Sequence, residues 1–119
     1  MSEIKKIDVS SLYAILLREI ENDSVQEIDP QLYSSIANFL GNLKNQGYDG
    51  VESKIKDALI SMITEMITLL LKIRMQKATS SDDLDYSNLL DEERYIVDSE
   101  DELRQRKDTI LAEIGRAHV

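Results

Sequence analysis

The sequence predicts an all-α protein, a bundle of about four to five helices with a long apolar central helix and a long C-terminal helix. Apolar residues recur at helical spacing in every apolar segment, and alternating runs of β-branched residues, which are typical of strands, are lacking. The 119 residues include only one Pro and four Gly, which favours helices joined by short connections. This length is typical of one domain, or of one domain plus a tail.

The first helix is expected to start after Ser10 or Ser11, because serine is a good N-cap. Its charged residues Arg18, Glu19 and Glu21 are expected on the side opposite the apolar residues. The segment 22–24 is expected to end the helix, since short polar side chains compete for backbone hydrogen bonds. The apolar residues of this helix are Leu12, Tyr13, Ile15, Leu16, Leu17 and Ile20.

The second helix has the clearest start signal, with Asp29 as the predicted N-cap and Pro30 at the first helical position. Ile28 and Tyr33 are spaced to form a hydrophobic staple across that cap. Gly47 is expected to stop the helix and to open a turn that ends at Gly50. One apolar face follows from the spacing of Leu32, Ile36, Phe39, Leu40 and Leu43.

The third helix is expected to run from about Val51 to Lys77 and to be apolar on nearly every side in its middle. A helix of that kind must be covered on most sides. The other helices are short, so we expect a partner chain to cover what they leave open. The thin polar stripe consists of Ser61, Glu65, Thr68 and Lys72.

The segment 78–85 reads as a polar, acidic connection to the last helix. From Tyr86 onward the apolar residues repeat every seven positions, which favours one helix from about Ser87 to Ile114, ended by Gly115. A rival interpretation breaks this helix near Asp98–Ser99, because Ser99 and Glu102 match a capping box. The repeating residues are Leu89, Ile96, Leu103 and Ile110, accompanied by Leu90, Val97 and Leu111.

Composition excludes several function classes. The chain has no Cys, so disulfides, thiolate zinc sites and cysteine nucleophiles are excluded, and its one His is His118, next to the last residue. A net charge of −9 argues against strong direct binding of nucleic acid. The most apolar stretch, residues 58–71, is too short for a bilayer span and contains Glu65. The N-terminus lacks the apolar run of a signal peptide, so we expect a cytoplasmic protein.

The charged clusters of the sequence have structural explanations. The acidic residues of segment 82–85 fail the spacing of a calcium-binding loop, and we expect no metal or cofactor. Asp91, Glu92 and Glu93 are expected on a solvated helix face. Lys72, Arg74 and Lys77 fall near the end of the third helix, where cations complement the helix dipole. No catalytic residues are expected, and the chain is predicted not to be an enzyme, without ATPase or nuclease activity.

An acidic helical bundle with excess apolar surface is typical of a subunit of an assembly. Leaving large apolar side chains of the third helix in water would forfeit about 1.5–3 kcal/mol each relative to burial. We therefore expect a subunit interface on the third and last helices. The residues expected at that interface are Leu59, Ile63, Met66, Ile67, Leu70, Ile73, Leu89, Ile96, Leu103 and Ile110.

Several segments resemble the helical domain of archaeal GINS subunits, in the class where this domain precedes a small β domain. The segments 16–21 (LLREIE) and 26–33 (QEIDPQLY) resemble its N-terminal part. The segment 70–77 (LLKIRMQK) resembles its long helix, with an apolar run followed by R-x-x-K. The segment 89–93 (LLDEE) matches the L-x-x-E-E opening of its last helix. The apolar continuation expected after Lys77 is missing.

The resemblance implies a helical domain over residues 1–115, with residues 116–119 as a tail or as the start of a linker to a small β domain that is absent. It implies a non-catalytic scaffold subunit in DNA replication, linking the MCM replicative helicase and a RecJ-like partner. The implied partners are a second GINS-type subunit or a second copy of the chain. The alternative is a generic helical adaptor or regulatory protein that dimerises through its C-terminal helix.

Overall fold

The structure is a computed structural model that describes residues 8–47, 49–80 and 86–117. In this part of the chain it contains four helices and no strand, which confirms the all-α prediction. The helices are α1 (Val9–Glu21), α2 (Leu32–Asn45), α3 (Val51–Ser80) and α4 (Asp91–Ala117).

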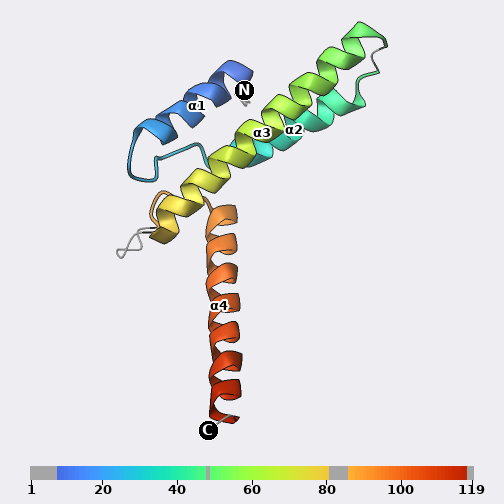
Figure 1. The fold of residues 1–119 in the computed structure, drawn as a ribbon. Helices are drawn as coiled ribbons and strands as arrows, with labels where there is room; N and C mark the ends of the chain where they lie inside the picture. Colours follow the sequence, from blue (N-terminus) through green and yellow to red (C-terminus); the bar gives the residue numbers. More distant parts are fainter. Residues whose placement is uncertain (1–7, 48, 81–85, 118–119) are drawn as a thin grey trace.

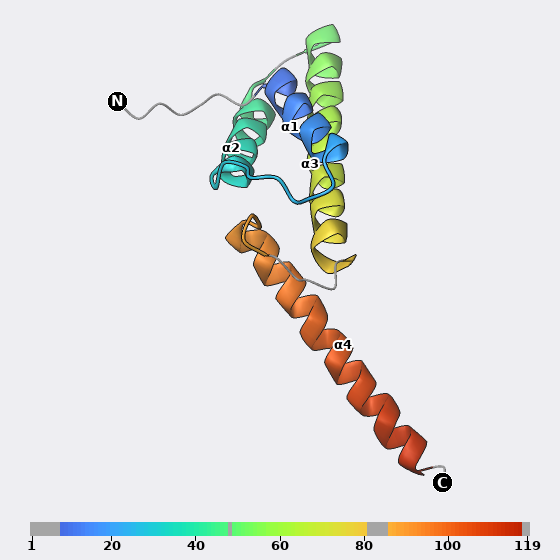
Figure 2. The ribbon, with the colours of Figure 1, turned by 90° about the vertical axis from the view of Figure 1, so that its left-hand side faces the viewer.

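Helix α3 is the organising element, because α1, α2 and α4 each pack against it. Figure 1 shows α1 and α2 beside α3, with α4 leaving from the region where α3 ends. The view of Figure 2 shows the same arrangement, with most of α4 pointing away from the other helices. The molecule measures 66 × 30 × 29 Å and has a radius of gyration of 19.3 Å. A compact domain of this length would have a radius of gyration of about 13–14 Å, so the molecule is elongated.

Two apolar clusters hold the helices together. The main cluster joins α1, α2 and α3, and the second cluster joins the end of α3 to the start of α4 and to the loop after α1. The apolar faces of three helices therefore meet around α3, while α4 is held only by its first turns. The buried residues of the main cluster are Leu12, Leu16, Leu32, Ile36, Ile63 and Leu70. Those of the second cluster are Val25, Ala78, Leu89 and Val97.

Helix α1 starts earlier than its serines suggest. Its N-cap is Asp8, whose carboxylate accepts a hydrogen bond of 2.7 Å from the backbone N–H of Ser11. The prediction of Ser10 or Ser11 as the cap is therefore wrong, since an aspartate two residues upstream satisfies the first free N–H groups. This bond lowers the pKa of the Asp8 carboxyl.

Helix α2 starts later than predicted. Asp29 and Pro30 belong to a turn before the helix, in which Asp29 Oδ1 accepts from the Gln31 N–H and the Asp29 carbonyl accepts from the Leu32 N–H. The first helical bond runs from the Ser35 N–H to the Gln31 carbonyl. The aspartate thus closes an Asx-type turn instead of capping the helix directly. Gly47 lies beyond the end of α2, which has its C-cap at Gln46.

Helix α3 begins at the predicted residue and ends three residues later than predicted, at Ser80. Gly50 has φ +62°, a left-handed conformation that glycine adopts without steric cost, and its carbonyl accepts the first helical bond from Lys54. Ala78 is buried in the second cluster, and this packing carries the helix past Lys77. The predicted turn between Gly47 and Gly50 and the acidic segment 81–85 lie partly or wholly outside the described residues.

Helix α4 is unbroken, so the interpretation with a break near Asp98–Ser99 is wrong. The helix begins at Asp91, later than the sequence pattern suggests, because residues 86–89 form a turn closed by a bond from the Leu89 N–H to the Tyr86 carbonyl. It passes Gly115, the predicted end, and continues to Ala117. An exposed ion pair at spacing i, i+4, between Glu102 and Arg106, lies in the segment after the suggested break.

Candidate functional site

A buried charge network lies where the four helices come closest. It consists of Glu19 on α1, Tyr33 on α2, Arg74 and Lys77 on α3, and Glu93 on α4. The side chains of Arg74, Glu19 and Glu93 are fully buried. Among the described residues, no buried side-chain nitrogen or oxygen lacks a hydrogen-bond partner. A buried charge is tolerated only when it is paired and hydrogen-bonded in this way.

Arg74 is the centre of the network, because its guanidinium group bonds to four residues from different segments of the chain. Its Nε and Nη2 donate to the two carboxylate oxygens of Glu93 at 2.8 and 2.9 Å. Its Nη1 donates to Glu19 Oε1 at 2.8 Å and to the Gln26 carbonyl at 2.6 Å. Nη2 also donates to the Asn88 carbonyl at 2.7 Å. These five bonds match the five N–H donors of a guanidinium group.

Glu93 ties the start of α4 to the rest of the molecule. Besides pairing with Arg74, its Oε1 accepts from the backbone N–H of Leu90 at 2.9 Å, which closes the first turn of α4 as in a capping box. Its Oε2 accepts from the Tyr33 hydroxyl at 2.8 Å. One carboxylate therefore caps its own helix and binds both α3 and α2.

Glu19 and Lys77 fasten the loop after α1 to the end of α3. The Lys77 Nζ donates to Glu19 Oε2 at 2.6 Å, to the Glu19 carbonyl and to the Ser24 carbonyl. The Glu19 carboxylate also accepts from the Gln26 N–H. This arrangement fixes the path of the chain between α1 and α2 against both α3 and the turn before α4.

The electrostatics of the network favour the charged forms of its acid and its base. Burial would raise the pKa of the Glu93 carboxyl, but bonds from Arg74, the Leu90 N–H and Tyr33 outweigh it and lower that pKa. Burial would lower the pKa of the Arg74 guanidinium, but its bonds to Glu93 and Glu19 raise it. Burial and the bond to ionised Glu93 raise the pKa of the Tyr33 phenol far above its usual value. The phenol therefore stays protonated and serves as a donor.

The expectations for these residues need correction. Glu19 lies on the buried face of α1, while Ile20 is exposed. The face of α1 that packs against the other helices is therefore not the predicted one. Glu93 is buried, whereas Asp91 and Glu92 are exposed as predicted. Arg74 is not a surface cation that complements the helix dipole, because it is paired in the interior. Helical spacing is the sequence signal that could have predicted the burial of Glu19. This residue follows Leu12 by seven positions and Leu16 by three, which places all three on one helical face.

Replacing Tyr33 by phenylalanine is expected to lower the free energy of unfolding by about 1.5–3 kcal/mol, because the Glu93 carboxylate loses a donor that water does not fully replace. Chemical denaturation of the purified chain measures this loss. Tyr95→Phe is the matched control, since Tyr95 is 75% exposed and its change should be near zero. Equal effects of the two substitutions would contradict the assigned role of the Tyr33 hydroxyl.

Stability is expected to fall in acid because of Glu93. A carboxyl whose pKa is lowered by folding contributes stability above its unfolded pKa, near 4.5, and this contribution is lost as pH falls through the folded value. Unfolding free energies measured from pH 7 down to pH 2 should show this decline, and Glu93→Gln should flatten it. Glu92→Gln, at an exposed neighbouring position, should leave the slope unchanged. A wild-type slope retained in Glu93→Gln would assign the effect to other carboxyls.

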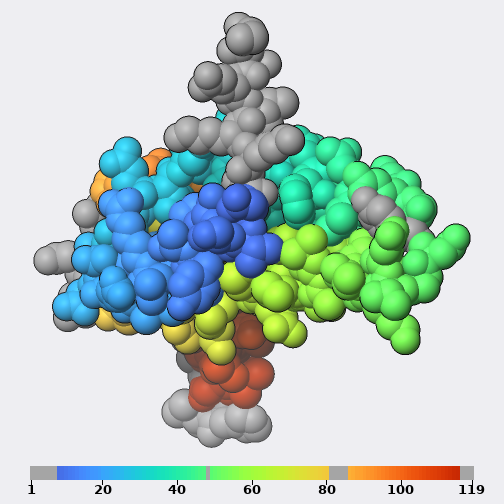
Figure 3. All heavy atoms as spheres, turned by 90° about the horizontal axis from the view of Figure 1, so that it is seen from above, coloured from blue at the N-terminus to red at the C-terminus, as the bar shows by residue number. Residues whose placement is uncertain are grey.

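The second candidate site is the C-terminal part of α4, residues 100–115, which we call the α4 arm. Every residue of the arm is exposed. Figure 3 shows, in a view from above, the end of α4 extending beyond the body of the molecule. The arm keeps large apolar side chains in water, all between 49% and 64% exposed, at Leu103, Ile110, Leu111 and Ile114. An uncovered apolar stripe of this kind on a helix marks a surface for another protein.

The structure divides the predicted interface residues into three groups, which are buried, partly buried and exposed. Ile63, Leu70 and Leu89 are buried in the chain's own clusters, so the expectation needs correction for these three. Leu59, Met66, Ile67 and Ile73 are partly buried and pack against the main cluster. Ile96 is partly buried, and only Leu103 and Ile110 are exposed. Of the predicted interface residues, the exposed ones therefore lie on α4, in the part that the neighbouring helices do not reach.

Helix α3 still presents some apolar residues to solvent on its other side. Met62 and Leu69 are 46% and 43% exposed, and Val51 and Ile55 near its start are more exposed still. The predicted polar stripe, Ser61, Glu65, Thr68 and Lys72, is exposed. Helices α1, α2 and α4 thus cover one side of α3, and its opposite side mixes apolar and polar residues.

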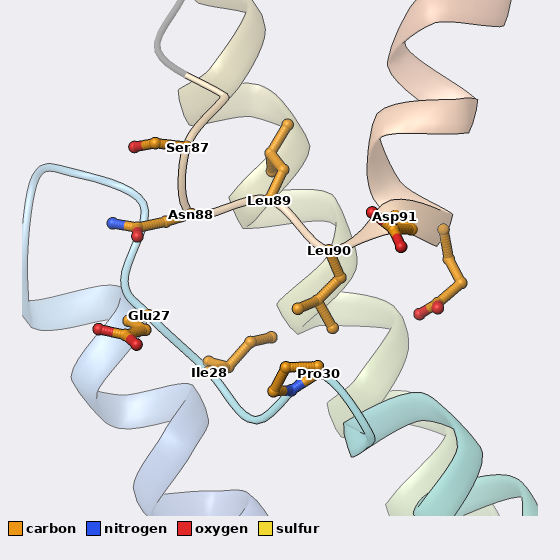
Figure 4. Close-up of a pocket in the computed structure, with 9 residues that line it drawn as sticks. Glu27, Ile28, Pro30, Ser87, Asn88, Leu89, Leu90 and Asp91 are labelled. Atoms are coloured by element: carbon orange, nitrogen blue, oxygen red, sulfur yellow. The ribbon is translucent and has the colours of Figure 1, made fainter.

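A pocket of about 340 Å³ lies at the start of α4, between the turn before that helix and the segment before α2. Figure 4 shows the side chains of Ile28, Pro30 and Leu90 facing one another in its centre, with carboxylates toward its sides. The carboxylates are those of Glu27, Asp91 and Glu92. No His, Lys or Arg is among its lining residues.

Within the described ranges, no group of three or more His, Asp and Glu side chains is arranged to hold a metal ion. None of the described helices combines the length and the apolarity that crossing a membrane requires. The acidic residues 82–85 and His118 lie outside the described residues.

Comparison of the chain with known protein families, with curated proteins and with solved structures finds no match.

Proposed function

We propose that this chain is a non-catalytic scaffold subunit of a GINS-type complex in DNA replication. In this role it links the MCM replicative helicase and a RecJ-like partner, and it assembles with a second GINS-type subunit or with itself. It has no ATPase or nuclease activity of its own and acts at the nucleoid through the replication machinery.

The observation that carries this proposal is the buried charge network. The four segments that resemble archaeal GINS subunits are distant in sequence, yet each contributes to this network. Glu19 comes from the first segment and Tyr33 from the second, Arg74 and Lys77 form the R-x-x-K pattern, and Glu93 ends the L-x-x-E-E pattern. Residues that satisfy one buried network cannot be exchanged one at a time. Their joint presence in the family's order is therefore more specific than any single motif.

The exposed surface supports an assembly role more than a catalytic one. The α4 arm leaves four large apolar side chains uncovered, as a subunit does before it meets its partner. Among the described residues, the buried charged side chains are those of Glu19, Arg74 and Glu93. They bond to one another, to other residues of the network and to backbone groups, so these bonds stabilise the fold. These features favour a protein that binds other proteins.

Affinity capture of the tagged full chain from an extract of its native cells, read by mass spectrometry, tests the proposal. Recovery of a second GINS-type subunit with MCM or a RecJ-like protein is the expected result. Leu103→Glu/Ile110→Glu, on the α4 arm, should lose these partners. Val51→Glu/Ile55→Glu, at exposed positions on α3, is the matched control and should retain them. A stable chain that captures none of these proteins would contradict the replication role.

The second candidate is a helical adaptor that dimerises through its C-terminal helix. The seven-residue spacing of Ile96, Leu103 and Ile110, with two of the three exposed, favours it. A self-contained dimer that captures no replication protein would select this candidate over the first.

A further inference from the structure

Two blocks of opposite charge flank Leu103 on α4. Residues 98–102 hold four acids and no base, and residues 104–107 hold three bases and no acid. Leu103 lies between the two blocks. Within one chain these charges make only exposed pairs, Arg104 with Asp101 and Arg106 with Glu102. Exposed pairs of this kind contribute little to stability, so the blocks remain available to a partner.

We propose that α4 pairs with α4 of a second copy of this chain in antiparallel orientation, about a two-fold axis near Leu103. In this orientation residues 99–102 of each copy lie beside the basic block of the other, and Asp98 lies beside Asp108. A two-fold axis makes the same contact twice, as an isologous dimer requires. A parallel pair would instead place the four acids of one copy beside the four acids of the other, which is repulsive.

The apolar residues agree with the same register. With the axis near Leu103, the position seven residues before it lies beside the position seven residues after it in the other copy. Ile96 of one copy then meets Ile110 of the second copy, and the two Leu103 side chains meet near the axis. Leu103 and Ile110 are both 56% exposed, and this pairing covers them. Charge and apolar pattern thus select one orientation and one register.

The uncovered state of the arm gives a further reason for a partner. Its 16 residues make no tertiary contact that buries a side chain. An isolated helix of that length is only marginally stable in water, and most helical stability in proteins comes from packing of an apolar face. A second α4 arm supplies this packing. The pairing requires only copies of this chain, so its test is independent of the replication role. The pairing can be wrong while the replication role is right, and the replication role can be wrong while the pairing is right.

Charge reversal tests the pairing. Sedimentation equilibrium of the full wild-type chain at micromolar concentration should show a dimer. Glu100→Lys/Asp101→Lys/Glu102→Lys should weaken self-association about tenfold or more, and so should Arg104→Glu/Arg106→Glu/Lys107→Glu. An equimolar mixture of the two variants should associate again, because its charge blocks are complementary. A wild-type chain that stays monomeric, or variants that dimerise as the wild type does, would overturn the proposal.

Cross-linking tests the orientation, because the chain has no Cys of its own. Two single-cysteine variants, Ile96→Cys and Ile110→Cys, are oxidised separately and as an equimolar mixture. In the antiparallel pair, two copies of residue 110 are separated by about 21 Å along the helix axis, so only the mixture should form a disulfide-linked dimer. Cross-linking of each variant alone, without the mixed product, would show a parallel pair and overturn the proposal.

Discussion

Replacing Arg74 by methionine is expected to lower the free energy of unfolding by about 3–5 kcal/mol, the largest effect of a single substitution on the charge network. The change leaves the carboxylates of Glu19 and Glu93 buried without their main cation. Breaking a buried pair by removing one partner costs this much because the remaining charge is uncompensated. Urea denaturation followed by circular dichroism measures the loss. Arg74→Lys is expected to recover only part of it, since lysine cannot make the forked contacts with Glu93.

Lys72→Met is the matched control for Arg74→Met. Lys72 lies two residues earlier on α3 and is exposed, so its substitution should change stability by no more than about 0.5 kcal/mol. If Arg74→Met were as stable as Lys72→Met, Arg74 would not be the centre of a buried network.

Leu70→Ala is expected to lower the free energy of unfolding by about 2–5 kcal/mol, because it leaves a cavity in the main cluster. Leu70 is fully buried, whereas the adjacent Leu69 is 43% exposed. Leu69→Ala should therefore cost much less in the same denaturation experiment. A similar loss for both variants, or a larger loss for Leu69→Ala, would mean that α3 turns a different face to α1 and α2.

Much of the fold could be predicted from the sequence because helical periodicity depends on local spacing alone. The exposed polar stripe through Glu65 followed from such spacing, and the start of α3 at Val51 followed from the turn predicted between Gly47 and Gly50. The ends of the helices were less predictable. Asp8, Ser10 and Ser11 are all acceptable caps, and only the tertiary position of the chain decides which one is used.

The charge network could not be predicted from single helices. Glu19, Arg74 and Glu93 each resemble ordinary surface charges in their own helix, because lysine, arginine and glutamate are mostly exposed. Their burial is tolerated only because the three helices bring opposite charges together, which is a property of the whole fold. The sequence contains one indirect signal, namely that all three occupy apolar-face positions.

For a related reason, the predicted interface included residues that the chain itself buries. Ile63 and Leu70 are apolar and helically spaced, but periodicity does not say whether the chain's own helices or a partner cover them. In the structure, α1 and α2 cover these residues, while α4 turns away and leaves its own stripe uncovered. The length of α4 beyond its last buried residue, Val97, decides where apolar surface remains.

Amide hydrogen exchange tests most directly the claim that the chain assembles through the α4 arm. The full chain is compared at low and high concentration, and with its captured partner. Protection that increases with association should be confined to residues 96–115, while the amides of α3 near Leu70 stay protected under all conditions because they lie in the core. Protection gained on α1 or α3 instead, or an arm that exchanges freely in every associated state, would contradict the account.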